Sequence, residues 1–378
     1  MIYILLTWLL APIWWPIAQL RKLGVSAPRR ILIAEIAGIG DVVCSASLFQ
    51  VLRDRYPHAT IDLLVDPIAQ GLTPLLPMVN RVRVFAYAEQ KGLKGRLKLA
   101  KLAASYDTAI CLIPSAAQLT GFCWGAVPRR LSVLPGNLNT SYRLLVPLLT
   151  GACRHQDGHY FPDTQFELCA ALLPNEQSRQ KSLVVTARTA AIQLPTNKHW
   201  VGLLVSSGRA LKRLSEAQLV ALATGMLNLA HNETGIVLLG GPGDRDQAQT
   251  VMTLLGNVQS CDAVVNTVGQ YELAQLPGIL QQLSVFVGVD SGVTHMADAL
   301  KVPVVCIAGP VNLQEVYQSG SGRVLLECSL DCHPCSTVFK TPNHCMRKDR
   351  ACLQQLDTSQ VVTQVQHLLE KGVLPHAQ

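Results

Sequence analysis

The chain alternates short apolar runs with longer amphipathic stretches, and this alternation limits what it can fold into more than any single motif does. Parallel strands are buried on both faces and are therefore apolar throughout, so the pattern predicts parallel sheets flanked by helices. The alternation begins near residue 31 and restarts near residue 200. We therefore predict an α/β protein with two Rossmann-like domains that face each other. The expected strands are residues 31–36, 61–65, 82–85 and 108–113 in the first half, and 200–207, 235–241, 264–269, 284–289 and 302–309 in the second.

A linker at Pro195, Thr196 and Asn197 divides the two halves. Ligands of such sheets bind outside the carboxyl ends of the strands, so the expected ligand site is a cleft between the domains. The predicted parts are a hydrophobic membrane-anchoring segment (1–24), an N-terminal Rossmann-like domain (30–195), a C-terminal Rossmann-like domain (198–356) and a C-terminal helix (357–378) that could cross back onto the first domain.

Residues 1–20 carry no charged side chain, and as a helix they would be about 30 Å long, close to the hydrocarbon thickness of a bilayer. Basic residues follow this segment instead of preceding it, which disfavours a secretory signal peptide and places the main body in the cytoplasm. Two prolines interrupt the segment and three tryptophans favour the headgroup region, so a full span and a monotopic anchor are both open, as is a buried core helix. The basic residues are Arg21, Lys22, Arg29 and Arg30.

Those four residues supply four of the seven net positive charges, which argues against a nucleic-acid-binding protein, because such a protein would spread basic residues over a folded face. Seven of the twelve cysteines are scattered without regular spacing, as buried thiols in a reducing compartment are. These seven are Cys44, Cys111, Cys123, Cys153, Cys169, Cys261 and Cys306.

Residues 90–106 alternate basic residues with leucines and predict a basic amphipathic helix. This helix could contact anionic lipid or a phosphorylated glycolipid acceptor, and a solvated helix face is the alternative. The basic residues singled out for this contact are Lys94, Arg96, Lys98 and Lys101.

The loop after the first expected strand contains Gly38, Gly40 and Asp41. The two glycines allow a tight turn, and the aspartate falls at the start of the following helix. A dinucleotide fingerprint is excluded because Val43 stands where a third glycine is needed. Asp41 is therefore either a helix cap or a carboxylate base held at the end of a strand.

The second half opens with a basic loop that contains Ser207, Gly208 and Lys212. Gly208 permits close backbone approach, and Lys212 with its neighbouring arginines supplies the cations that a diphosphate requires. Ser215 and Gln218 form a capping-box pattern, which places this loop just before a helix. A solvated basic loop is the alternative.

Residues 240–247 form another loop between a strand and a helix. Gly241 opens it, and Asp244 or Asp246 could accept hydrogen bonds from a ribose. The D-R-D spacing also resembles a metal-binding motif, but a three-residue pattern recurs often by chance.

The stretch 285–310 is the most specific in the chain. An expected strand ends at Val289, and the small residues after it open a helix whose amides would hold an anionic oxygen. A nucleophile elbow is excluded because one residue too many precedes the serine. The residues expected at this anion site are Asp290, Ser291, Gly292, Val293 and His295.

Four motifs occur in this order: GIGDVV (38–43), Lys212-Arg213 before a helix, GGPGDRD (240–246) and VGVDSGVTHMADALKVPVVCIAGP (287–310). Together they resemble glycosyltransferase family 9, the heptosyltransferases of lipopolysaccharide core synthesis. The chain departs from the family at Leu214 and Ser215, where Trp-Pro is common, and at Ser291, where threonine is more usual.

The resemblance implies a GT-B fold and an inverting transfer from a nucleotide-diphosphate sugar, usually ADP-heptose, without a cofactor or an essential metal. The family's base corresponds to Asp41, its phosphate-binding lysine to Lys212 and its ribose-contacting acid most nearly to Asp244. Its diphosphate loop corresponds to Asp290, Ser291, Gly292 and His295. The first domain would then bind the acceptor and the second the donor.

Five cysteines cluster late in the chain, and the family often carries C-x-P-C and C-x6-C pairs there. Four of these thiols could close a zinc site or hold an iron-sulfur cluster, although their spacing is irregular for either. Reduced structural thiols are the alternative. The four candidate ligands are Cys332, Cys335, Cys345 and Cys352.

The sequence therefore predicts a membrane-associated inverting glycosyltransferase on the cytoplasmic side of the bacterial inner membrane. Its expected partners are a nucleotide-sugar donor, a lipid-linked or core saccharide acceptor and the membrane. The alternatives are a nucleotide-sugar epimerase and a catalytically degenerate, membrane-tethered saccharide-binding subunit.

Overall fold

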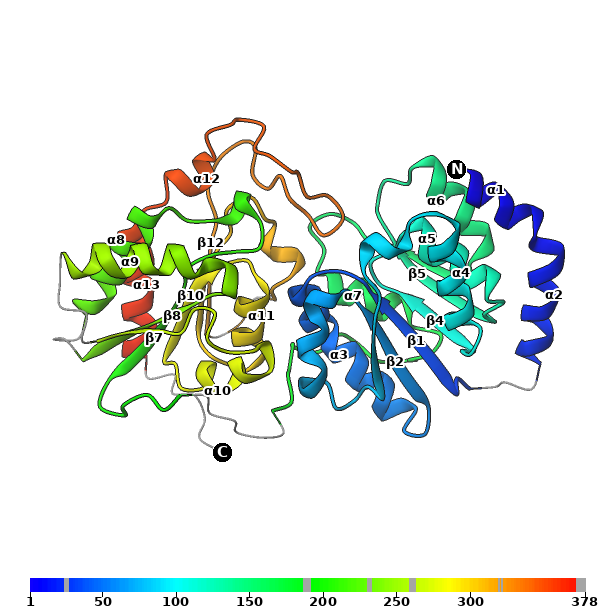
Figure 1. The fold of residues 1–378 in the computed structure, drawn as a ribbon, viewed down its shortest axis with the longest axis horizontal. Helices are drawn as coiled ribbons and strands as arrows, with labels where there is room; N and C mark the ends of the chain where they lie inside the picture. The colour runs from blue at the N-terminus through cyan, green and yellow to red at the C-terminus, as the bar shows by residue number, and fades with distance from the viewer. Residues whose placement is uncertain are drawn as a thin grey trace. The chain divides into compact units, whose positions relative to one another are not determined.

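The computed structural model describes residues 1–23, 27–185, 192–229, 233–257, 263–318, 320 and 322–371. The chain divides into two compact units, Met1–Lys181 and Ser182–Gln378. Each unit contains one six-stranded parallel sheet with helices on both of its faces (Figure 1). The two parallel-sheet α/β units predicted from the sequence are confirmed.

The sheet of the first unit has the strand order β3-β2-β1-β4-β5-β6. Its central strand, β1, pairs with β2 and β4, and Ile33 is in register with Leu63 on one side and Ile110 on the other. All three of these side chains are fully buried, as expected for a sheet covered on both faces. The strands are β1 (Arg30–Glu35), β2 (Thr60–Val65), β3 (Arg81–Val84), β4 (Thr108–Cys111), β5 (Arg129–Leu134) and β6 (Gly151–Arg154).

The sheet of the second unit has the order β12-β11-β10-β7-β8-β9. Counted from its own first strand, it repeats the 3-2-1-4-5-6 order of the first sheet, which is the Rossmann order. The strand order reverses between β1 and β4 in one sheet and between β7 and β10 in the other, so each unit has a ligand-binding switch point there. The strands are β7 (His199–Leu204), β8 (Thr234–Leu239), β9 (Val264–Asn266), β10 (Val285–Val289), β11 (Val304–Ile307) and β12 (Arg323–Leu326).

All nine expected strands are present, and β5, β6 and β12 are additional. β6 and β12 lie at sheet edges and are four residues long and partly exposed, so they lack a buried apolar run. β5 opens with two arginines, which hid it in the sequence. Arg130 is nevertheless only 1% exposed, because Leu148 O accepts its Nε–H at 2.9 Å and the Trp14 ring covers its guanidinium.

Helices of the first unit cover its sheet in two layers, with α3 beside α7 on one face and α4 beside α5 on the other (Figure 1). They are α1 (Ile2–Leu9), α2 (Ala11–Lys22), α3 (Ile39–Arg55), α4 (Gly92–Ala103), α5 (Ala116–Trp124), α6 (Thr140–Leu145) and α7 (Phe161–Leu168). The helix expected within residues 90–106 is thus α4.

In the second unit, α8 packs between α9 and α13 (Figure 1). From the sequence, the last helix could cross back onto the first domain. In the structure this helix, α13, packs on α8, and Val362 fills the space beside Gly225. The helices are α8 (Glu216–Leu227), α9 (Arg245–Gly256), α10 (Leu276–Leu280), α11 (Gly292–Ala299), α12 (Ala351–Gln354) and α13 (Thr358–Glu370).

The N-terminal hydrophobic segment forms two helices, α1 and α2, which meet at an angle of 63°. No single helix in the described part of the chain is long and apolar enough to cross a bilayer, and this bent pair meets the length and composition criteria only when its two helices are taken together.

Five of the seven scattered cysteines are buried free thiols and Cys153 is partly exposed, while Cys261 lies outside the described residues.

Candidate active site

The switch point of the second unit joins two loops that are about eighty residues apart in the sequence. Lys212 ends a short 3-10 turn (Ala210–Lys212) after β7, and Asp290 directly follows β10. Lys212 Nζ lies 2.5 Å from Asp290 Oδ2, and His295 Nε2 lies 3.0 Å from Asp290 Oδ1. The His295 ring stacks on Tyr317 with 4.7 Å between ring centroids. The structure therefore brings together the three residues that the sequence singled out most strongly in this unit.

Asp290 is the electrostatic centre of this group. It is 8% exposed, and both of its carboxylate oxygens are engaged. Burial favours the neutral acid, but the Lys212 ammonium and the His295 imidazole outweigh that effect, so the pKa of Asp290 lies well below its ordinary value. Asp290 is therefore an anion that orients Lys212 and His295.

Helix α11 begins beside Asp290. Ser291 caps it by accepting the Thr294 N–H at 3.3 Å, and the Thr294 hydroxyl donates to Val289 O at 2.6 Å. Gly292 and Val293 form the first turn, whose N–H groups have no acceptor within the helix. An anion placed there would meet both amides and the positive end of the helix dipole.

The loop after β7 keeps its cations close to backbone carbonyls. Arg213 Nε donates to Ser207 O at 2.9 Å, and Arg350 donates to Ala210 O at 2.9 Å. A Cβ at Gly208 would meet no atom within 4 Å, so packing does not require this glycine, and the space above it is open to a ligand.

The capping box predicted at Ser215 and Gln218 is present at the start of α8, and the Ser215 side chain accepts the Gln218 N–H at 3.2 Å. Leu214 and Ser215, which stand where the family commonly has Trp-Pro, are therefore compatible with a well-formed start of α8.

The loop after β8 has a different geometry. Asp244 Oδ2 accepts the Gly241 N–H at 2.8 Å and closes the turn before α9. Asp246 lies in the first turn of α9 and lines a separate cavity. The two aspartates of the D-R-D motif thus have different surroundings.

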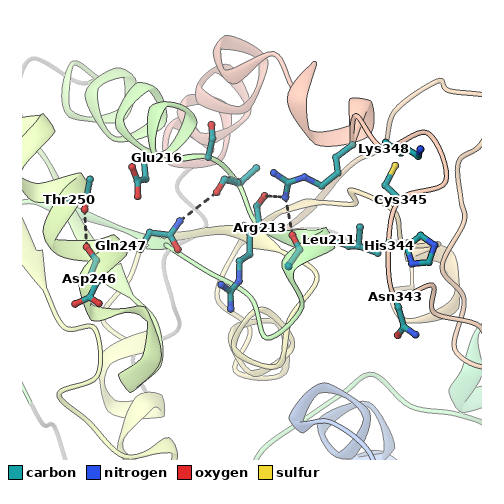
Figure 2. A pocket seen from close by; sticks show the side chains of 14 residues that line it. Leu211, Arg213, Glu216, Asp246, Gln247, Thr250, Asn343, His344, Cys345 and Lys348 are labelled. Carbon is teal, nitrogen blue, oxygen red and sulfur yellow. Dashed lines mark hydrogen bonds between the residues drawn. The ribbon is translucent and has the colours of Figure 1, made fainter.

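That cavity, of about 970 Å³, lies between the loop after β7, helix α9 and residues 343–350 (Figure 2). Figure 2 shows Gln247 and Thr250 on one wall and His344 and Lys348 on the opposite one. Neither Lys212 nor Asp290 lines it. No pattern in the sequence indicated it, because residues 343–350 lie more than ninety residues beyond the two other segments that form its walls.

In the first unit, Asp41 lies in the first turn of α3, after the central strand β1. Its Oδ2 accepts the Gly38 N–H at 2.8 Å, and the residue is partly exposed. Gly40 belongs to the same turn. The capping role that the sequence left open is therefore real, and it uses only one of the two carboxylate oxygens for this bond.

Sequence reasoning missed Glu35, the last residue of β1. It is fully buried and accepts a hydrogen bond from the Ser45 hydroxyl at 3.3 Å, while Gln165 donates to Ser45 at 2.7 Å. Burial and the negative charge of Asp41 raise the pKa of Glu35 well above its ordinary value, and the Ser45 hydrogen bond offsets this only in part. A charged residue inside an otherwise apolar run was the signal that could have revealed it.

The basic residues of α4 are not equivalent. Arg96 stacks over the Tyr3 ring at 4.2 Å, and Lys98 pairs with Glu89. Lys94 and Lys101 are exposed and form no ion pair within the described part of the chain.

The late cysteines Cys332, Cys335, Cys345 and Cys352 line one small cavity in the second unit. Burial, followed by the neighbouring thiols, raises the pKa of Cys352 to about 11. In the described ranges, no group of three or more His, Cys, Asp or Glu side chains is arranged to hold a metal ion.

Residues 159–341 match the family model described as glycosyltransferase family 9 (heptosyltransferase). Lipopolysaccharide heptosyltransferase 2 of Salmonella typhimurium is 24% identical over 312 residues, which cover 74% of this chain and 83% of that protein. Its Escherichia coli counterpart is 24% identical over 307 residues, with the same coverage. The resemblance identified in the sequence is confirmed.

Two solved structures share the fold. The ADP-heptose lipopolysaccharide heptosyltransferase II of E. coli superposes with a TM-score of 0.69 at 20% identity, over 90% of this chain and 99% of the other. A family 9 glycosyltransferase from Veillonella parvula gives a TM-score of 0.68 at 18% identity, over 91% and 98%.

Proposed function

We propose that this chain, whose residues 159–341 match the model of glycosyltransferase family 9, transfers a heptose from ADP-heptose to a lipopolysaccharide core or related glycolipid acceptor, with inversion at the anomeric carbon and without a metal. The observation that carries the proposal is the Lys212–Asp290–His295 group at the switch point of the second sheet. A solved E. coli heptosyltransferase with ADP has the same fold at 16% identity and a TM-score of 0.62.

The donor diphosphate would lie at the start of α11. There the amides of Gly292 and Val293 and the ammonium of Lys212 face developing negative charge on the leaving group. Asp290 acts by positioning Lys212 and His295. Asp244 is proposed to accept hydrogen bonds from the ribose, in addition to closing its own turn.

The acceptor would dock on the first unit, with Asp41 as the general base. The acceptor hydroxyl gives its proton to the Asp41 carboxylate as its oxygen bonds to the anomeric carbon. The bond from that carbon to the diphosphate breaks, and its electron pair leaves with the nucleoside diphosphate. Attack from the opposite face inverts the anomeric configuration.

We further propose that the protein works at the cytoplasmic side of the inner membrane, held there by its hydrophobic N-terminal segment. A glycolipid acceptor would meet the enzyme at that surface.

The test is to incubate the full chain with ADP-heptose and, separately, with other nucleotide sugars, in the presence of a core glycolipid and with or without a chelator. Release of ADP coupled to heptosylation of the glycolipid, unchanged by chelator, is expected. Donor turnover without acceptor would favour an epimerase, and chelator-sensitive transfer would contradict the metal-independent mechanism. No turnover of any donor would favour a saccharide-binding subunit.

A further inference from the structure

Helices α1 and α2 are attached to the first unit by one narrow face. Ile4, Trp14 and Ala18 on that face are buried in the same apolar cluster as side chains of β1, β4 and α5. Their burial makes the N-terminal helix pair an integral part of the unit, even though its sequence is that of a membrane segment.

Directed hydrogen bonds fix the pair along its length. Trp8 Nε1 donates to Leu144 O at 3.0 Å, and Trp124 Nε1 donates to the Thr7 hydroxyl at 2.9 Å. At the other end, the Arg21 guanidinium donates to the carbonyls of Gly125, Ala126 and Tyr106 at 2.8–3.0 Å. To cross a bilayer, the pair would have to give up all of these contacts. At 8 and 12 residues, each helix is also about 12 Å and 18 Å long, well below the hydrocarbon thickness.

The opposite face of the pair is apolar and exposed. Ile2, Leu9 and Leu20 keep 72%, 75% and 68% of their surface in contact with solvent. Exposed apolar side chains clustered in this way mark a surface that binds something. The outward face comprises Ile2, Leu9, Ile13, Ile17, Leu20 and Leu23.

Helix α4 extends this face. The stacking of Arg96 over Tyr3 joins α4 to α1, and Leu93 and Leu97 of α4 are exposed by 45% and 52%. In the sequence Lys94 lies between these two leucines, and Lys101 lies one helical turn after Leu97. Figure 1 shows α1, α2 and α4 on the same side of the first unit.

The charge of this surface identifies its partner. No Asp or Glu occurs in residues 1–34 or 90–106, while Lys22, Lys94 and Lys101 are exposed there. The nearby exposed Glu89 is paired with Lys98, so Lys22, Lys94 and Lys101 leave the face with an excess of positive charge. An apolar face with excess positive charge is complementary to a bilayer that contains anionic lipid. Trp15 of α2 is 39% exposed, and an amphipathic indole at the edge of the helix pair suits the headgroup region.

We propose that α1, α2 and the outward face of α4 form a monotopic platform, which lies in the plane of an anionic bilayer and inserts its apolar side chains only to the level of the acyl-chain boundary. The platform rests on the proposed membrane location and specifies how it is achieved. It leaves the sugar-transfer chemistry untouched.

The first test measures binding of the full chain to vesicles of 30% phosphatidylglycerol and 70% phosphatidylcholine by flotation. The double variant Ile13→Glu/Ile17→Glu should bind at least tenfold more weakly, because it places charge where apolar surface must be buried. The matched control Ile68→Glu/Leu254→Glu changes exposed apolar residues outside the platform and should bind like the wild type.

The charge component is tested with Lys94→Glu/Lys101→Glu, which should weaken binding about tenfold on the anionic vesicles and leave binding to pure phosphatidylcholine unchanged. The matched reversal Lys340→Glu/Lys371→Glu, in the second unit, should have no effect. Equal loss in test and control variants would overturn the assignment of the surface.

The depth to which the tryptophans insert distinguishes a platform in the plane of the bilayer from a membrane-spanning segment. Lipids spin-labelled at acyl carbon 5 should quench the tryptophan fluorescence more than lipids labelled at carbon 12. The double variant Trp8→Phe/Trp15→Phe, which removes both exposed indoles of the segment, should remove most of that difference. Stronger quenching at carbon 12 would overturn the in-plane arrangement. If the Ile13→Glu/Ile17→Glu variant instead dissociates an oligomer and the wild type does not float, the face is a protein interface and the proposal is wrong.

Circular dichroism and transfer to a water-soluble core saccharide separate these outcomes from misfolding and from failure of the proposed function. The Ile13→Glu/Ile17→Glu variant should retain the wild-type spectrum and transfer to the water-soluble acceptor. A protein that binds vesicles as described but transfers no sugar would contradict the proposed function and leave the platform standing.

Discussion

Asp41 and Asp290 occupy related places in two sheets of the same strand order, yet their surroundings differ. Each follows a strand at the switch point of its unit. Asp290 is buried and has each oxygen engaged, one by Lys212 and one by His295. Asp41 is partly exposed, and its Oδ2 accepts a backbone N–H of its own loop. Two sheets of the same strand order thus hold carboxylates with different surroundings. Asp290 is placed to orient cations, and Asp41 is exposed enough to contact a substrate.

The variant Asp41→Asn should have the largest effect on activity, and it tests whether the Asp41 carboxylate is the general base. The asparagine carbonyl can still accept the Gly38 N–H, so the start of α3 should remain intact. Loss of the base should lower the transfer rate by about 10²- to 10⁴-fold. Initial rates and thermal unfolding of the same samples measure the two effects separately.

The control for this variant is Asp66→Asn, because Asp66 also accepts a backbone N–H, from Ile68, at the start of a 3-10 turn in the first unit. It should retain activity and lose only a little stability, because Asp66 Oδ2 also accepts the Tyr87 N–H at 3.1 Å and asparagine has one acceptor oxygen fewer. Wild-type transfer by Asp41→Asn would remove Asp41 from the mechanism.

Asp290→Asn should affect folding as well as activity. It leaves the Lys212 ammonium without its counter-charge in a site where Lys212 is only 16% exposed, which should cost about 3 kcal/mol of unfolding free energy. Transfer should fall about 10²-fold as the donor-side cations lose their orientation.

The pH dependence of Asp290→Asn has a definite sign. The folded pKa of Asp290 lies below the unfolded value of about 3.9, so its contribution is complete above that value and is lost as the pH falls toward the folded pKa. Urea midpoints of wild type and variant should therefore differ most at neutral pH and converge in acid. A gap that stays constant with pH would mean that the charge of Asp290 is not responsible.

Glu35→Gln should have the smallest effect on transfer, less than about tenfold, because Glu35 is fully buried and does not touch the substrate. Its effect on stability runs opposite to that of Asp290. The folded pKa is raised, so the wild type loses stability as the pH rises above the unfolded value of about 4.3 and continues to do so up to the folded pKa.

The stability of the Glu35→Gln variant should not fall in this way as the pH rises. Urea unfolding of both proteins between pH 4 and pH 9 measures the difference. Parallel curves for wild type and variant would show that Glu35 does not hold its proton in the folded protein.

Sequence alone predicted the parts of the site that depend on local chemistry. Loops rich in glycine and serine after apolar runs marked the ends of β1, β7, β8 and β10, and the rule for parallel sheets placed all four loops where ligands bind. The sequence did not predict the strand order that brings the loops after β7 and β10 to one switch point. It could not show that Asp290 engages Lys212 and His295 together, because that depends on side-chain packing across two loops.

The sequence was least informative where distant segments meet. Lys98 and Arg96 were grouped with Lys94 and Lys101 by spacing, yet Glu89 and Tyr3 engage the first two. The hydrophobic N-terminal segment was predicted as a separate part of the chain because its composition is that of a membrane anchor. Its buried face depends on partners in α5 and α6, which no local pattern reveals.

The contacts of Arg130 have a practical consequence for purification. Leu148 O accepts its Nε–H, and the ring of Trp14 covers its guanidinium. Removing an apolar N-terminal segment is a routine way to make a protein easier to purify. Here it would remove the lid from a buried cation and, with Trp14 alone, core packing worth about 3–5 kcal/mol. A shortened chain would be expected to aggregate, so purification should begin from the intact N-terminus in detergent or lipid nanodiscs.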